Sequence, residues 1–137
     1  MDALEALRAK IPGFPGFEDA DARRLSDEEV RAYLGEAMAP LEDRLSLAGP
    51  QAERFESTLL RAEFMNQAAF RVYESAKLDD AQNAAMAAAD VTAIELADRA
   101  DAVDASTLDA YLDSVNAVFD ERDRIMKASA PAPTSFP

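Results

Sequence analysis

The chain contains no cysteine and no histidine. The lack of cysteine excludes disulfide bonds, thiolate catalysis and cysteine-ligated metals. The lack of histidine removes the most common general base and the most common transition-metal ligand in proteins. Because the usual catalytic and metal-binding constellations are excluded, we expect a protein that is not an enzyme and has no cofactor.

Long apolar runs are also absent from the sequence. No stretch approaches the roughly 18 consecutive apolar residues of a membrane-spanning helix, and the first residues lack the apolar centre of a signal peptide. We therefore expect a cytoplasmic protein without membrane contact. The 137 residues suit one domain, and a hydrophobic content of 49% is enough to build a core.

Basic residues are few: 14 Lys and Arg stand against 27 Asp and Glu, which gives a net charge of −13. Direct binding to nucleic acid is disfavoured, because phosphate contacts require clustered Lys or Arg. The acids are unevenly placed, since residues 79–120 hold ten acids and one base, Arg99. Four of these acids share one broad side of a predicted helix and form a candidate acidic face: Asp90, Asp98, Asp101 and Asp104.

The candidate acidic face has two interpretations. An ordinary solvated helix face is the more common one. The functional interpretation is a negative surface that attracts a basic partner, either a basic protein or one that normally binds nucleic acid.

Apolar residues recur with the spacing of α-helices in four long segments, residues 26–48, 50–77, 79–103 and 106–127. No segment shows the alternation that is typical of β-strands. The sequence therefore predicts an all-α fold, a helical bundle of about four main helices with short N-terminal helices and a Pro-rich C-terminal tail.

We expect one helical domain over residues 1–127. It consists of an N-terminal arm over residues 1–25, which carries a Pro-Gly-Phe loop, and a bundle over residues 26–127. Residues 128–137 form the Pro-rich tail, whose composition is typical of flexible or polyproline-like chain.

Three single features refine the expected helices. Ser26 and Glu29 have the spacing of a capping box, which predicts a helix start at Ser26. Pro40 predicts a kink or a break near Ala39, and the apolar phase that continues past it favours a kink. Arg122 interrupts the apolar stripe of the last helix, and we expect it to bury its stem while its charge stays in water.

Residues 50–77 carry the longest uninterrupted helical pattern. Besides its main stripe it has a second apolar strip that includes Leu60 and Phe64. A helix that is apolar on two sides lies at the centre of a bundle or covers one side with a partner. If the bundle leaves Leu60 and Phe64 uncovered, they form an apolar patch rimmed by charge, as protein-binding surfaces do. The main stripe contains Phe55, Leu59, Ala62, Ala69, Tyr73 and Ala76.

The tandem Pro-Gly-Phe units at residues 12–17 present two rings, Phe14 and Phe17, from a stiff loop. Packing of both rings against the end of the bundle is favoured, and an aromatic hook for another protein is the alternative. Phe136 is the one residue of the tail that is suited to hold it against a surface. The candidate partner-binding residues are therefore Phe14, Phe17, Leu60, Phe64 and Phe136.

Asn66 lies within the main stripe of the 50–77 segment, where a buried amide needs hydrogen-bond partners. It is more often a residue that fixes helix packing than one that lines a ligand pocket with Tyr33, Tyr73 or Tyr111. Glu63 is a weak candidate for acid–base chemistry, because it lies off the main stripe. No metal site is expected, since the acids at residues 18–21 lack the Gly and the downstream Glu of a calcium loop.

These observations predict a non-catalytic protein–protein interaction module, a small acidic adaptor, regulator or accessory subunit of a larger complex. Its partner is another protein, and both a basic partner and a homo-oligomer stay open. The first alternative is an acidic decoy that mimics nucleic acid and inhibits a basic nucleic-acid-binding protein. The second is a small-molecule-binding helical bundle.

Overall fold

A computed structural model describes residues 2–64, 71 and 76–129 of the chain. None of these residues belongs to a β-strand, and the predicted all-α bundle is confirmed. The described helices follow in the order α1 (Ala3–Lys10), α2 (Ala20–Met38), α3 (Leu41–Arg44), α4 (Gly49–Glu63), α6 (Asp80–Asp98), the short 3-10 helix η1 (Ala100–Ala102) and α7 (Leu108–Ser129).

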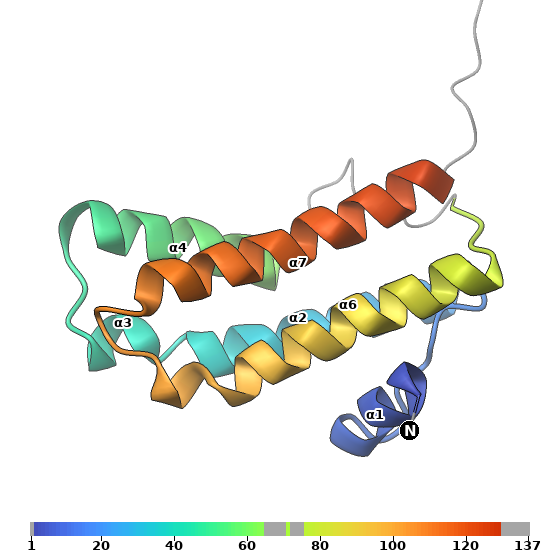
Figure 1. Ribbon diagram of the computed structural model, residues 1–137, viewed down its shortest axis with the longest axis horizontal. Helices are drawn as coiled ribbons and strands as arrows, with labels where there is room; N and C mark the ends of the chain where they lie inside the picture. The colour runs from blue at the N-terminus through green and yellow to red at the C-terminus, as the bar shows by residue number, and fades with distance from the viewer. Residues whose placement is uncertain (1, 65–70, 72–75, 130–137) are drawn as a thin grey trace, which may run out of the picture.

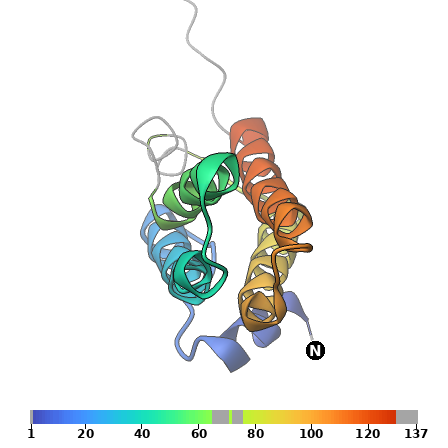
Figure 2. The same ribbon diagram turned by 90° about the vertical axis from the view of Figure 1, so that its left-hand side faces the viewer.

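The four long helices, α2, α4, α6 and α7, lie at the corners of a square when the molecule is seen end-on (Figure 2). Helices at adjacent corners pack together: α2 contacts α4 and α6, and α7 contacts the same two helices. The short α1 packs on α6, outside the square (Figure 1). Buried apolar side chains from Leu7 to Met126 form one continuous core.

The Pro-Gly-Phe loop after α1 belongs to this core. Gly13 and Gly16 have φ angles of 80° and 91°, in the left-handed region that glycine favours. The two turns direct Phe14 and Phe17 inward, where their rings meet edge to face with centroids 5.8 Å apart. Only 1% of Phe14 and 5% of Phe17 is exposed. The rings pack against the bundle, and the alternative that they form a hook for a partner is wrong.

The first long helix begins earlier than the sequence predicts. The Asp19 carboxylate accepts the Ala22 N–H at 2.7 Å and caps α2 at its N-terminus. The predicted capping box is therefore wrong, because Ser26 and Glu29 lie within a helix that has already started. The Ser26 hydroxyl donates instead to the Gly16 carbonyl oxygen at 2.7 Å. The expected boundary between arm and bundle at residues 25 and 26 falls inside α2.

A break, not a kink, separates α2 from the next helix. α2 ends at Met38, and Pro40 precedes the first residue of α3. Proline has no N–H to continue the helical hydrogen bonds, so the chain turns at this point. A positive φ of 63° at Gly49 then starts α4, with proline at the next position.

The predicted helix over residues 50–77 is shorter in the structure, and its continuous form is wrong. α4 ends at Glu63, and Phe64 has extended backbone with φ −130° and ψ 135°. The Arg31 guanidinium from α2 donates to the carbonyl oxygens of Arg61 at 2.5 Å and Phe64 at 3.4 Å. A side chain of another helix thus supplies hydrogen-bond donors to carbonyl oxygens at the end of α4. Asn66 and Tyr73 lie outside the described residues.

The expectation that this segment occupies the centre of the bundle is also wrong. α4 stands at a corner, where it packs on α2 and α7 (Figure 2). Phe55, Thr58 and Ala62 are buried on its inner side. Leu60 and Phe64, on the second apolar strip, face away from the bundle. The second option given by the sequence, that a partner covers this side of the helix, stays a prediction.

Within the described ranges, no helix is long and apolar enough to cross a membrane. The cytoplasmic location stays a prediction. α7 continues to Ser129, two residues beyond the expected end of the domain. Phe136 and most of the predicted tail lie outside the described residues.

Candidate functional site

Two large apolar side chains at the end of α4 face solvent. Leu60 is 59% exposed and Phe64 is 64% exposed. They are one turn apart, at the point where the helix gives way to extended chain. In the part of the chain that the structure describes, the other exposed large hydrophobic residue is Leu25 of α2, at 42%. We refer to Leu60 and Phe64 together as the α4 patch.

Acidic side chains surround the α4 patch. Glu53, Glu56 and Glu63 are exposed and lie one or two helical turns from Leu60, on its side of α4. No ion pair among the described residues involves any of the three. The pKa of Glu42 in α3 is raised, first by a hydrogen bond with the Glu56 side chain, and burial and the Glu56 charge add to the effect. We call Glu53, Glu56 and Glu63 the acidic rim.

A pocket of about 430 Å³ opens beside the patch, between α2 and the end of α4. Glu63 and Phe64 line it from the end of α4. From α2 it is lined by two arginines, three acids and two small residues: Arg24, Arg31, Asp27, Glu28, Glu36, Ala32 and Gly35. The pocket is narrow at Gly35, because a Cβ atom at this position would lie 3.0 Å from Cγ of the Glu63 side chain. The pocket thus combines the exposed Phe64 ring with four carboxylates and two guanidinium groups, of which Arg24 pairs with Glu28 and Arg31 with Asp27.

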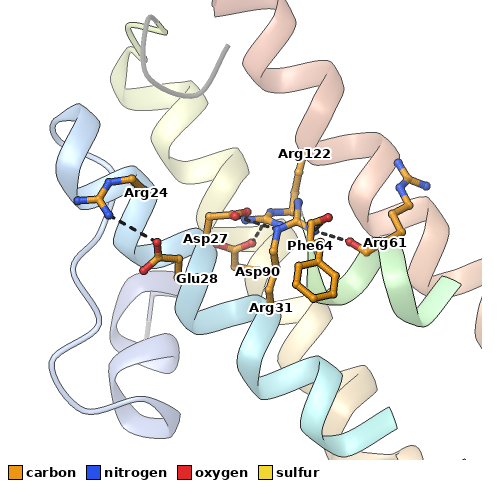
Figure 3. Close-up of polar contacts among 8 residues, drawn as sticks. All are labelled: Arg24, Asp27, Glu28, Arg31, Arg61, Phe64, Asp90 and Arg122. Atoms are coloured by element: carbon orange, nitrogen blue, oxygen red, sulfur yellow. Dashed lines mark hydrogen bonds and ion pairs between the residues drawn. The ribbon is translucent and has the colours of Figure 1, made fainter. Parts of the chain in front are cut away.

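A buried ion network adjoins the pocket and shares two residues with its lining, Asp27 and Arg31 (Figure 3). It consists of Asp27 and Arg31 of α2, Asp90 of α6 and Arg122 of α7, and each is less than a tenth exposed. Arg31 Nε donates to Asp27 Oδ2 at 2.8 Å, and Arg122 Nη2 donates to Asp27 Oδ1 at 2.6 Å. Arg122 Nε lies 2.8 Å from Asp90 Oδ1. The negative charges of the two carboxylates therefore offset the positive charges of the two guanidinium groups in the interior.

Asp90 accepts fewer hydrogen bonds from the described residues than Asp27 does. Although Arg122 Nε is within ion-pair distance, neither carboxylate oxygen of Asp90 accepts a hydrogen bond from the described residues. Burial raises the pKa of Asp90 to about 6, against the opposing effect of the Arg122 charge. The ionised form of this carboxyl is thus less favoured than that of an exposed Asp.

Two expectations about these residues are wrong. Asp90 was assigned to a solvated acidic face, yet it is fully buried. Arg122 was expected to keep its charge in water, and it too is fully buried. Both charges are tolerated in the interior because oppositely charged groups from adjacent helices meet there.

Arg31 connects the ion network to the α4 patch. Its Nε holds Asp27, while its Nη1 donates to the last carbonyl oxygens of α4. The guanidinium also lies over the Phe119 ring, with Cζ 4.7 Å from the centroid. Figure 3 shows Phe64 on one side of Arg31, with Asp27 and Asp90 on the other side. The position of Phe64 thus depends on a side chain that belongs to the network.

The other members of the candidate acidic face do not form one surface with Asp90. Asp98 accepts a hydrogen bond from the Tyr33 hydroxyl at 2.6 Å and pairs with Lys10 at 3.0 Å, and these contacts lower its pKa. Asp104 accepts bonds from Ser106 and the Thr107 N–H, which lower its pKa as well. Asp101 is exposed.

Much of the negative charge in residues 79–120 is matched by nearby bases. Arg54 pairs with two acids of α7, and Arg61 pairs with Asp120 at 2.7 Å. These pairs reduce the unbalanced charge that a nucleic-acid mimic requires, and the decoy stays a prediction. Five of the ten acids form ion pairs with described residues: Asp90, Asp98, Asp109, Asp113 and Asp120.

Two of the three tyrosine hydroxyls considered for a ligand pocket, those of Tyr33 and Tyr111, have protein partners, and Tyr73 lies outside the described residues. The Tyr111 hydroxyl donates to the Leu96 carbonyl oxygen at 2.8 Å, and Tyr33 donates to Asp98. Glu63 is exposed, as expected for a solvated side chain. In the described ranges, no group of three or more acids is placed to hold a metal ion.

Sequence reasoning found the α4 patch but missed the pocket and the ion network. Asp27 and Arg31 are four residues apart, a spacing that also occurs in ordinary surface pairs. The usable signal was Arg122, a charge within an otherwise apolar stripe. Comparison of the chain with protein-family models, with curated proteins and with solved structures finds no match.

Proposed function

We propose that this protein is a non-catalytic interaction module, an adaptor, regulator or accessory subunit, that binds a basic segment of another protein at the α4 patch and the adjoining pocket. The observation that carries the proposal is the exposure of Leu60 and Phe64, each more than half open to solvent at the end of a helix. Apolar side chains within a charged rim are typical of protein-binding surfaces.

The charge around the patch favours a basic partner. The acidic rim surrounds Leu60, and Glu36 and Glu63 face the pocket without a basic partner among the described residues. A Lys or Arg side chain that enters the pocket can pair with these carboxylates and lie against the Phe64 ring. An apolar side chain of the same segment would then cover Leu60.

The same charge disfavours a second copy of this chain as the partner. A symmetric dimer through the patch would bring two acidic rims together, and like charges in one interface weaken association. A partner with alternating apolar and basic residues avoids this repulsion. It also associates faster, because opposite charges steer the encounter.

Site-specific photo-crosslinking in cells that express the protein tests the proposal. A photoreactive residue replaces Leu60 in one variant and Leu25 in a matched control, since Leu25 is also exposed but does not line the pocket. We expect a protein that is crosslinked from position 60 and not from position 25. That protein is then purified, and its affinity for the wild-type chain, Phe64→Ala and Leu25→Ala is measured.

Loss of at least about tenfold in affinity for Phe64→Ala, with Leu25→Ala unchanged, supports the proposal, since residues that anchor an interface contribute on this scale. Equal affinity of all three proteins would refute it. A crosslink from position 60 to a second copy of the same chain would also refute the basic partner and replace it with a homo-oligomer.

A further inference from the structure

We propose that the buried ion network fixes the end of α4 and that protonation of Asp90 releases it, so that acidification moves Phe64 and weakens the docking surface. The effect on affinity rests on the proposed function. The effect on α4 does not, because it concerns the free protein alone.

The first step is a continuous chain of contacts from Asp90 to Phe64. Asp90 faces Arg122 Nε at 2.8 Å, and Arg122 Nη2 donates to Asp27 at 2.6 Å. Asp27 in turn accepts Arg31 Nε at 2.8 Å, and Arg31 Nη1 donates to the carbonyl oxygens of Arg61 and Phe64. Three of the four links join different elements, α6 to α7, α7 to α2 and α2 to the end of α4, and the link from Asp27 to Arg31 lies within α2.

The second step is the change in charge. With both acids ionised, two negative groups match Arg31 and Arg122. When Asp90 takes up a proton, Asp27 is the one ionised acid left among the four described residues of the network. Arg31 binds Asp27 Oδ2 and Arg122 binds Oδ1, so both guanidinium groups then share the charge of one carboxylate. A change in how Arg31 holds Asp27 also changes how it holds α4, because one rigid guanidinium makes both contacts.

Asp90 is the group of the network that is suited to take up the proton. It is fully buried and accepts no hydrogen bond from the described residues, whereas both oxygens of Asp27 accept one. The charged groups that face it are Arg122 from α7 and Asp27 and Arg31 from α2. From α1, Lys10 pairs with Asp98, two turns farther along α6.

Arg61 holds the last turn of α4 to α7 through Asp120 at 2.7 Å, and Ala62 of the same turn is buried, so the release concerns Phe64 beyond that turn. Phe64 closes the helix through one backbone bond, from its N–H to the Leu60 carbonyl oxygen at 3.0 Å. Its ring is exposed, so packing does not fix it. A small shift of Arg31 is therefore transmitted to the residue that carries the docking surface.

Nuclear magnetic resonance of the free protein tests the inference between pH 7.5 and 4.5. The carboxyl carbon of Asp90 reports its protonation, and the amide signals of Arg61 and Phe64 report the end of α4. We expect all of them to change with one shared midpoint. In Asp90→Asn, the amide signals lack this midpoint and keep the low-pH position throughout. Asp98→Asn, an exposed acid on the same helix, leaves the transition in place.

Amide signals that do not follow the Asp90 carbon, or that keep the transition in Asp90→Asn, would overturn the inference. If Asp90→Asn does not fold, the wild-type protein alone still tests the inference, because the Asp90 carboxyl carbon and the amides of Arg61 and Phe64 must then share one pH midpoint. Once a partner is known, we expect its affinity to fall about fivefold or more from pH 7.5 to 5.5 for the wild type and to stay level for Asp90→Asn. Failure of the docking proposal would leave the amide result unchanged.

Discussion

Arg122 of α7 donates to Asp27 of α2 at 2.6 Å in the interior of the bundle, across 95 positions of sequence. Asp27 also accepts Arg31, so one carboxylate joins two guanidinium groups. Arg31 then reaches the carbonyl oxygens at the end of α4. The exposed patch at that helix end is thus built on a buried charge arrangement, not on apolar packing alone.

The two acids of the network differ in their contribution to stability. Asp27→Asn leaves two buried cations without their shared acceptor, and we expect the free energy of unfolding at pH 7.5 to fall by about 3–5 kcal/mol. Asp90→Asn removes a buried charge that accepts no hydrogen bond from the described residues, so stability stays level or rises. Urea unfolding followed by circular dichroism measures both. The exposed Asp21→Asn is the matched control, and equal losses at positions 27 and 90 would contradict this account.

The pH dependence of stability follows from the raised pKa of Asp90, about 6 in the folded protein against an ordinary value of 3.8. Between these values the folded state binds more protons at Asp90 than the unfolded state. The contribution of Asp90 to stability is therefore fully present below the ordinary pKa and is lost as pH rises through about 6.

The comparison of wild type with Asp90→Asn isolates this contribution. From pH 4.5 to 6 we expect the wild type to lose stability relative to the variant, with a slope of at most about 1.4 kcal/mol per pH unit. Urea unfolding at several pH values measures the difference. A difference that does not change with pH, or that changes in the opposite direction, would show that Asp90 is not the titrating group.

Phe14 and Phe64 have opposite surroundings and should respond in opposite ways to truncation. Phe14 is buried against Phe17, and Phe14→Ala should lower stability by about 3–5 kcal/mol. Phe64 is exposed, and Phe64→Ala should change stability by no more than about 0.5 kcal/mol. Thermal and urea unfolding test both variants. A large loss in Phe64→Ala would mean that the ring serves the fold and not a partner.

Gly35 offers a change that separates stability from docking. Alanine favours a helix by up to about 1 kcal/mol over glycine, and the new Cβ would meet the flexible side chain of the exposed Glu63 at 3.0 Å. We expect Gly35→Ala to keep or raise stability while it displaces Glu63 and narrows the pocket. Partner affinity should fall in the same protein, as measured by calorimetry. Unchanged affinity would show that the pocket does not take part in binding.

Local rules of helix formation made most of the fold predictable. The apolar spacing identifies the long helices, and Asp79 caps the start of α6 in a local motif with Gln82, three residues farther along the chain. Local rules failed where a distant residue decides the outcome. α4 ends at Glu63, where Arg31 of α2 donates to the carbonyl oxygens of Arg61 and Phe64, and this contact between distant residues cannot be read from the 50–77 segment alone.

The sequence predicted the exposed α4 patch of the candidate site but not the buried ion network. Leu60 and Phe64 stood out because they lie off the main apolar stripe of their helix. The ion network did not, because pairing of Asp90 with Arg122 joins segments whose contact the sequence does not show. A charge in an apolar stripe admits two solutions, a stem that reaches water or a buried pair, and the choice depends on the adjacent helix.

The most direct test of the docking surface is the affinity of the protein that is crosslinked through position 60. Its dissociation constant is measured with the wild type, Phe64→Ala and Leu25→Ala, all folded to the same helix content. The account predicts a rise of at least about tenfold for Phe64→Ala and none for Leu25→Ala. Equal constants for all three proteins would contradict it.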